Sequence, residues 1–238
     1  MHTDRQTQRI RYTYIPYMRH NSHLKILIFS CNILFYLAYS DSVKKISLIL
    51  SFFCFFQCFT ASAESPKALQ SFENWTLYTQ IEDGQKVYFI AATPVGRSGN
   101  YTSRGAQHIW VRCISKNIDE VSITPGYPYK GDYYPQVATY KKKEDFLKYK
   151  QGMMENAKKG ECRVKNPSAS YVFDVLDGDI AWLKNVEDDE NAIKSMKSDI
   201  YAVVVAKSRK GTCSLDLYSL KGFAKAHNKM KELCEKVF

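Results

Sequence analysis

One set of residues in this sequence could form a serine-type catalytic triad. Ser214 would be the nucleophile and Asp216 the residue that orients the base. The base would be His108 or His227. Ser214 and Asp216 stand two positions apart, so on a strand both point to the same side, and no special turn exposes the serine. We therefore do not expect a triad.

Other signatures of catalysis are absent from the sequence. GxSxG, HExxH and a Walker-type glycine-rich loop do not occur. The acidic run 187–190 lacks the DxDxDG pattern of a calcium loop and is better explained as the first turn of a helix. Cys213 is a poor nucleophile, because a strand cysteine in an exported protein is more often bonded or buried. The sequence predicts no catalytic site and no cofactor.

The cysteines fall into two groups. Three of the seven lie in apolar N-terminal runs, and four lie in the rest of the chain: Cys113, Cys162, Cys213 and Cys234. Four cysteines in an oxidising compartment can pair in three ways, which the sequence does not rank. A zinc site is disfavoured, because CxxC spacing is missing and only His108 and His227 accompany these cysteines.

Residues 43–63 have the organisation of a secretory signal. Two lysines precede an apolar core at 46–59, and Ala-Ser-Ala at 61–63 precedes Glu64. The core has about 14 residues, whereas a spanning helix needs roughly 20. The signal predicts export to the periplasm, the outer membrane or the medium, with membrane contact through this segment alone.

Residues 1–42 precede that signal and contain a second apolar run at 24–39. The two runs could form a membrane hairpin, which would tether the protein. We favour another reading, in which Val43 is the start of translation and 1–42 is a spurious extension. The domain would then be 64–238, about 175 residues with one core.

Removal of the N-terminal part changes the charge. Residues 1–63 hold seven basic and two acidic residues, so 27 basic and 22 acidic residues remain, a net charge of +5 instead of +10. This balance favours acidic surfaces but is too small to argue for nucleic-acid binding.

Short alternating stretches after residue 72 predict an antiparallel β-sandwich, mainly β, with a short helix and a C-terminal helix. The helices are expected at 187–197 and from Ser219, a good N-cap, onward. Ala192, Ile193 and Met196 would be buried on the first helix. The expected strands are 74–80, 85–93, 108–115, 119–124, 170–176, 179–183, 200–206 and 212–218. The C-terminal helix would present one buried stripe: Leu220, Phe223, His227, Met230 and Cys234.

Residues 141–165 are rich in lysine. They predict a helix that is broken at Gly152, ends at Gly160 and lies as a solvated excursion from the sandwich. A charged surface helix is the simpler interpretation. The functional alternative is a basic contact for anionic lipid or polysaccharide.

Five segments follow one another along the chain in a definite order and spacing: SFENWTLYTQIEDGQKVYFIAATPVGRSGNYTSRG, GYPY, DGDIAWLK, ENAIKSMKS and KGTCSLDLYSLKGFAKAHNKMKELC. Together they resemble the invasion-associated locus B family of alphaproteobacteria, and the resemblance covers most of residues 71–234. It implies an exported, β-rich envelope domain without known catalytic activity, linked in some pathogens to entry into host red cells.

The cysteines depart from that family's pattern. Members often have a cysteine at the position of Tyr88 that could pair with one at Cys234, and tyrosine at the position of Cys213. The lysine-rich segment also matches the family poorly. We therefore expect a rewired disulfide set drawn from Cys113, Cys162, Cys213 and Cys234.

These observations favour an exported, non-enzymatic envelope protein that contacts envelope or host-surface components. The alternative is an envelope hydrolase or carbohydrate-processing enzyme whose site is assembled from scattered loops. The expected contact surface comprises four tyrosines, because exposed tyrosines make adaptable contacts. They are Tyr127, Tyr129, Tyr133 and Tyr134.

Overall fold

The computed structural model describes residues 65–129 and 131–238. The predicted extension 1–42 and the predicted signal 43–63 lie outside the described residues. Among the helices within these limits, none has the length and apolar character needed to cross a membrane.

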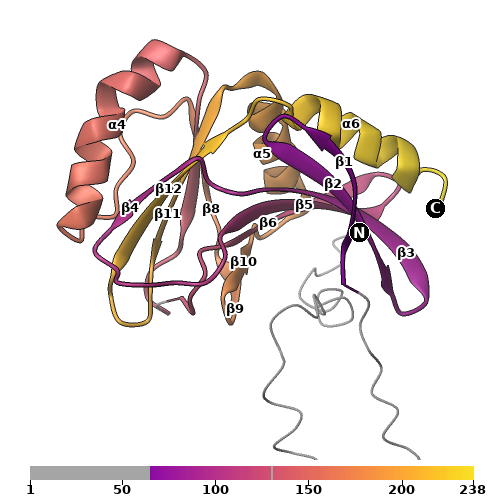
Figure 1. Ribbon diagram of the computed structural model, residues 1–238, viewed down its shortest axis with the longest axis horizontal. Coiled ribbons are helices and arrows are strands. Elements are labelled where there is room, and N and C mark those ends of the chain that lie inside the picture. Colours follow the sequence, from indigo (N-terminus) through magenta and orange to yellow (C-terminus); the bar gives the residue numbers. More distant parts are fainter. Residues whose placement is uncertain (1–64, 130) are drawn as a thin grey trace, which may run out of the picture. The chain divides into compact units, whose positions relative to one another are not determined.

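The described residues form two antiparallel sheets that face each other as a sandwich, as predicted (Figure 1). One sheet has seven strands in the order β1-β2-β3-β5-β6-β10-β9. The first three strands form a meander, because each returns beside the previous one through a short turn. The strands are β1 (Lys67–Phe72), β2 (Trp75–Glu82), β3 (Gln85–Ala92), β5 (His108–Ser115), β6 (Ile118–Thr124), β9 (Val175–Asp177) and β10 (Ile180–Trp182).

The second sheet has five strands in the order β4-β12-β11-β7-β8. Its centre is β11, whose residues pair with β12 on one side and with β7 on the other. The strands are β4 (Gly96–Gly99), β7 (Gln136–Tyr140), β8 (Ala169–Val172), β11 (Tyr201–Lys207) and β12 (Cys213–Ser219).

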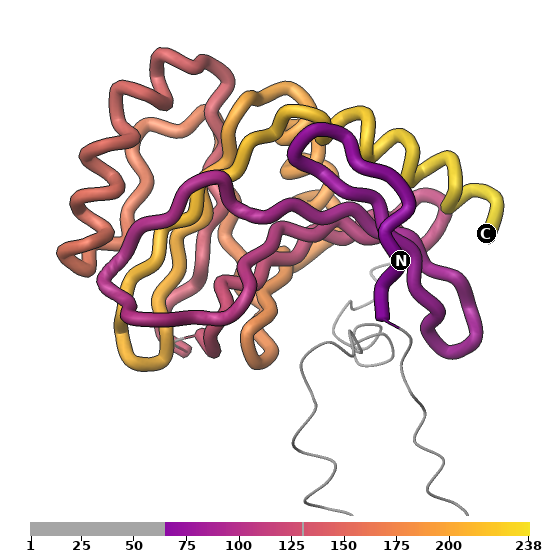
Figure 2. Tube along the Cα trace, in the orientation of Figure 1, coloured from indigo at the N-terminus to yellow at the C-terminus, as the bar shows by residue number. Residues whose placement is uncertain are grey.

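Helices α4 (Lys143–Lys158), α5 (Val186–Ser198) and α6 (Phe223–Cys234) cover the sheets. Helix α6 contacts β1, β2, β3 and β5, so the last helix lies beside the first strands (Figure 2). Its predicted stripe is buried throughout. Trp75 is also fully buried, stacks edge-on against Phe223 at 4.8 Å and donates its indole N–H to the Ser219 carbonyl.

The main core lies between the sheets and under α5 and α6. It contains inward residues of both sheets, such as Leu77, Ile90, Val111, Val137 and Val204. Alternation along each strand puts these residues on one face, which is the sequence pattern that predicted the sandwich. The expected burial of Ala192, Ile193 and Met196 on α5 is confirmed.

A second core lies on the other face of the five-stranded sheet, beneath α4. Phe146, Met153 and Ala157 of α4 pack there against strand residues such as Leu215. The prediction of a solvated excursion is therefore wrong for this face of the helix. The predicted break at Gly152 is also wrong, because the helix continues through this residue. Gly152 is exposed, and a Cβ added to it would have no neighbouring atom within 4 Å.

Two further predictions need correction. The expected strand 170–176 is two strands, because β8 pairs with β7 in one sheet and β9 pairs with β10 in the other. Ser219 is not the N-cap of the last helix, because it pairs with Tyr201 at the end of β12. The N-cap is Gly222, whose φ is +91°. A Cβ added to this residue would lie 1.9 Å from the carbonyl oxygen of Phe72, so the position requires glycine.

Candidate functional site

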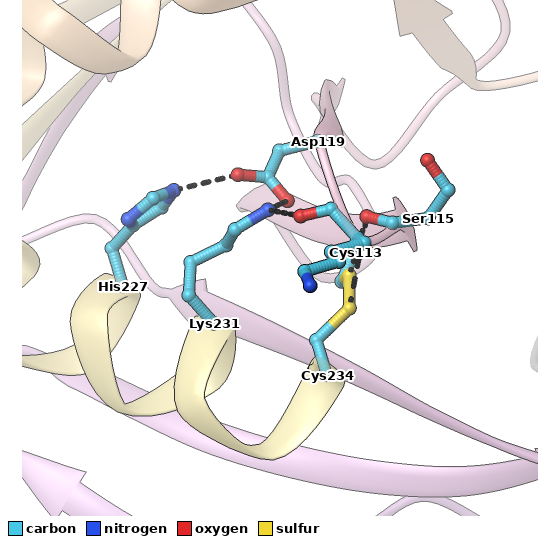
Figure 3. Close-up of a disulfide and its surroundings, with 7 residues drawn as sticks. Cys113, Ser115, Asp119, His227, Lys231 and Cys234 are labelled. Carbon is cyan, nitrogen blue, oxygen red and sulfur yellow. Dashed lines mark hydrogen bonds and ion pairs between the residues drawn. A yellow bond between two sulfur atoms is a disulfide. The ribbon is translucent and has the colours of Figure 1, made fainter. Parts of the chain in front are cut away.

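A charged cluster surrounds Asp119 beside the disulfide between Cys113 and Cys234 (Figure 3). The Asp119 carboxylate accepts hydrogen bonds from Nε2 of His227 and from Nζ of Lys231, both at 3.0 Å. Lys231 also donates to the Lys116 carbonyl at 2.8 Å. One carboxylate therefore joins the β5–β6 hairpin to two successive turns of α6.

Local sequence explains this arrangement. The β5–β6 hairpin has an irregularity between Cys113 and Ser115, and Asp119 follows its tight turn. On α6, His227, Lys231 and Cys234 follow one another at helical spacing of four and three residues, so all three face the hairpin. The disulfide closes the same seam by joining β5 to the end of the helix.

His227 is fixed within this cluster as a packing residue. It is 4% exposed, lies 5.8 Å from the Phe223 ring and uses Nε2 to donate to Asp119. Its other nitrogen, Nδ1, is buried without a hydrogen-bond partner. A catalytic base must bring a nitrogen within hydrogen-bond reach of the substrate, and neither nitrogen of His227 is placed to do so.

An open depression of about 300 Å³ lies next to Asp119. Its walls come from the β5–β6 turn and from α5. Burial lowers the pKa of Lys197, while the nearby Asp119 charge opposes that shift. The exposed Glu190, Lys194 and Lys197 place charges of both signs at the rim of the depression, whereas the Asp119 carboxylate is engaged by His227 and Lys231. The lining residues are Asn117, Asp119, Glu190, Ile193, Lys194 and Lys197.

The residues of the candidate triad have other partners. Asp216 is fully buried and receives a bidentate ion pair from Arg104. The Ser214 hydroxyl forms a hydrogen bond with the Tyr127 hydroxyl. The His108 ring lies tilted against the Trp110 ring, with the ring centroids 4.6 Å apart, and burial, with a smaller effect of Arg97, lowers the pKa of His108.

The Arg104 pair is an internal structural contact. Burial lowers the pKa of Arg104, but hydrogen bonds and the charge of Asp216 outweigh burial, so the net direction is upward. Burial acts oppositely on Asp216 and raises its pKa against the effect of Arg104. We regard both groups as ionised, because a bidentate contact favours the charged forms of both. The loop that carries Arg104 is held by a bond from Gly105 N to Gly126 O of 2.8 Å.

The four tyrosines expected at a contact surface have different surroundings. Tyr134 is 49% exposed, as a contact residue should be. Tyr129 is 6% exposed and donates to the Ile123 carbonyl, so its assignment to a contact surface is wrong. Tyr127 packs against the main core, and Tyr133 packs partly against the second core. Tyrosine serves cores and surfaces equally well, which is why sequence alone did not separate these cases.

All four cysteines of the described part are in disulfides. Cys113 pairs with Cys234, and Cys162 pairs with Cys213. The second bond ties the segment after α4 to the start of β12. Cys213 is bonded and fully buried, so its thiol is not a nucleophile in this form of the protein. Within 65–129 and 131–238, no three His, Cys, Asp or Glu side chains converge as metal ligands would.

Comparison with known proteins gives a distant likeness to a solved structure. No protein family model matches the chain, and no curated protein matches it. Among solved structures, invasion associated protein b from Bartonella henselae is similar at 14% identity with a TM-score of 0.46. The match covers 71% of this chain and 98% of that one.

Proposed function

We propose that this chain is an exported envelope protein of the invasion-associated locus B type that acts by binding and not by catalysis. The observation that carries the proposal is the pair of disulfides, Cys113–Cys234 and Cys162–Cys213. Such bonds persist in the periplasm, at the cell surface or outside the cell, where thiols are oxidised. The signal-like segment 43–63 leads to the same compartments.

The surroundings of the polar side chains support binding as the mode of action. The hydroxyl of Ser214, the carboxylate of Asp216 and the imidazole of His227 are all committed to internal partners. The depression beside Asp119 instead offers charges of both signs on a surface. Charges of both signs at a surface support reversible recognition of polar groups.

Envelope components or host-surface components are the proposed partners. We choose these partners because the sequence resembles the invasion-associated locus B family. For the same reason we propose that the protein contributes to host-cell entry. The depression beside Asp119 supplies one place where such a partner could bind.

Capture with the exported protein tests this proposal. The protein purified from cells, immobilised through a lysine-free tag, is presented with envelope and host-membrane fractions. We expect a partner that is retained by the oxidised protein and lost when the protein is reduced and alkylated. A variant with Lys194→Glu and Lys197→Glu inverts the charge of one wall of the depression and should release the partner, whereas Lys86→Glu with Lys225→Glu should not. If neither fraction yields a partner, the binding role is contradicted.

A further inference from the structure

The excess positive charge of the domain is concentrated in one segment. Residues 141–165 hold nine basic and four acidic residues, a net charge of +5. The rest of 64–238 holds 18 basic and 18 acidic residues, so its net charge is zero. The nine cations are Lys141, Lys142, Lys143, Lys148, Lys150, Lys158, Lys159, Arg163 and Lys165.

These cations are also available. None of the nine forms an ion pair with another described residue, and all but the partly buried Lys150 are exposed. On α6 the situation differs, because Lys229, Lys231 and the adjacent Lys236 each pair with a carboxylate. A surface cation without an ion-pair partner does not have to break such a pair before it binds an external anion.

Two tyrosines mark the ends of a basic strip on this segment. At one end, Lys148 and Lys165 place their ammonium groups 5.3 and 5.7 Å from the Tyr149 ring centroid. At the other end, Lys207 lies 5.3 Å from the Tyr133 ring centroid. The Tyr133 hydroxyl donates to the Cys162 carbonyl, which places this end beside Arg163. We call Tyr133, Lys148, Tyr149, Arg163, Lys165 and Lys207 the basic strip.

The segment 162–166 runs from one end of the strip to the other, and it is held in place although it is neither helix nor strand. The Cys162–Cys213 bond anchors its start. The Tyr140 hydroxyl donates to the Lys165 carbonyl at 2.8 Å, and the Asn166 amide donates to the Tyr149 hydroxyl at 2.9 Å. An extended stretch from Cys162 to Asn166 covers about 13 Å. A preorganised row of cations loses little entropy when it binds a ligand.

The outer face of α4 decides between a flat and a linear partner. At 100° per residue, the face opposite Phe146 carries Glu144, Lys148, Glu155 and Lys159, so its charges alternate in sign. A membrane plane would meet both glutamates. A chain-like polyanion can instead follow the strip and meet this face of the helix at Lys148 alone.

We propose that the basic strip binds a linear anionic polysaccharide. Its carboxylate or sulfate groups pair with the lysines and Arg163, and its sugar rings rest against Tyr133 and Tyr149. This partner rests on the proposed function, because such polysaccharides occur in bacterial envelopes and on host surfaces. The basic strip shares no residue with the lining of the depression beside Asp119.

Binding of heparin, a sulfated probe, to the disulfide-bonded exported protein tests the proposal. The variant Lys148→Gln, Lys165→Gln and Lys207→Gln should bind at least about tenfold more weakly at physiological salt. The slope of log affinity against log salt should fall by about one unit per lost contact. The control Lys86→Gln, Lys184→Gln and Lys225→Gln removes the same charge from other exposed lysines and should bind like the parent.

Parallel probes separate the alternatives. Polygalacturonate should bind and neutral dextran should not. Equal losses in the strip and control variants would overturn the proposal, as would binding to phosphatidylglycerol vesicles without binding to heparin. The thermal unfolding of each variant is compared with that of the parent, so that a folding defect is distinguished from a loss of binding. None of these results depends on where the protein is found in the cell, so the proposed export can stand if the strip fails.

Discussion

Cys113 of β5 and Cys234 of α6 are bonded across 121 residues of sequence, and the bond lies beside the Asp119 cluster. The last helix is thereby fixed to the seven-stranded sheet by a covalent bond, a carboxylate and a packed stripe at one seam. Cys162 and Cys213 fasten the other sheet in the same way across 51 residues. Each sheet thus has its own covalent tie to the segment that covers it.

Removal of the two disulfides should destabilise the protein unequally. Each double substitution to alanine, at Cys113 with Cys234 or at Cys162 with Cys213, should cost about 2–5 kcal/mol. Removal of the Cys113–Cys234 bond, which closes the longer loop, should cost about 0.8 kcal/mol more than removal of the other bond. The reason is that the entropy gained by the unfolded chain rises with the length of the loop that is opened. Urea unfolding measures both values. A larger loss for the Cys162–Cys213 bond would contradict the chain-entropy explanation.

Gly222 and Gly84 provide a matched pair for backbone strain. Both have positive φ, +91 and +78, but a Cβ at Gly222 would lie 1.9 Å from the Phe72 carbonyl oxygen, while Gly84 has no neighbour within 4 Å. Gly84→Ala should cost about 1 kcal/mol from the left-handed conformation alone. Gly222→Ala should cost several times more, as measured by thermal unfolding. Equal losses would show that the approach of β1 to the α6 cap is not as close as described.

The Arg104–Asp216 pair should show strong coupling in a double-mutant cycle. Arg104→Met or Asp216→Leu alone should cost about 3–5 kcal/mol, because each leaves a buried charge without its partner. The two together should cost much less than the sum of the single losses. Lys221 and Glu73 form an exposed pair that serves as the control, with an expected coupling below about 1 kcal/mol. Additive losses at Arg104 and Asp216 would refute the buried contact.

Stability should fall with acidification partly through His108. Burial, with help from Arg97, lowers the pKa of His108 below its usual 6.5 in the folded state. The unfolded chain therefore binds the proton more readily, and the free energy of unfolding decreases as pH falls from about 6.5 through the folded pKa. His108→Gln should flatten this part of the pH profile, with a change of at most about 1.4 kcal/mol per pH unit. An unchanged profile would place the titration elsewhere.

The sandwich could be predicted because its central strands carry strong local patterns. NWTLYTQ and QKVYFIAA alternate around a turn, and the structure pairs them as β2 and β3. Strand β4, Gly96–Gly99, was missed because its sequence GRSG has no strand pattern. It is extended because it pairs with β12 at the edge of the sheet, which is a tertiary effect.

The candidate site could be predicted only in its parts. His227 was expected on the buried stripe of the last helix, and its burial is confirmed. Its partner Asp119 lies 108 residues earlier, and no spacing in the sequence joins the two. The cysteines were expected to be available for pairing, whereas the choice among three pairings depends on which strands and helices meet.

Peptide mapping of the native protein tests whether the chain is exported with both disulfides formed. Protein recovered from the envelope and medium of the producing cells is alkylated, digested without reduction and analysed by mass spectrometry with N-terminal sequencing. We predict a mature chain that begins at Glu64 and two linked peptide pairs, Cys113 with Cys234 and Cys162 with Cys213. Recovery only from the cytoplasm, with a start upstream of Val43 and four alkylated thiols, would contradict export in an oxidised form.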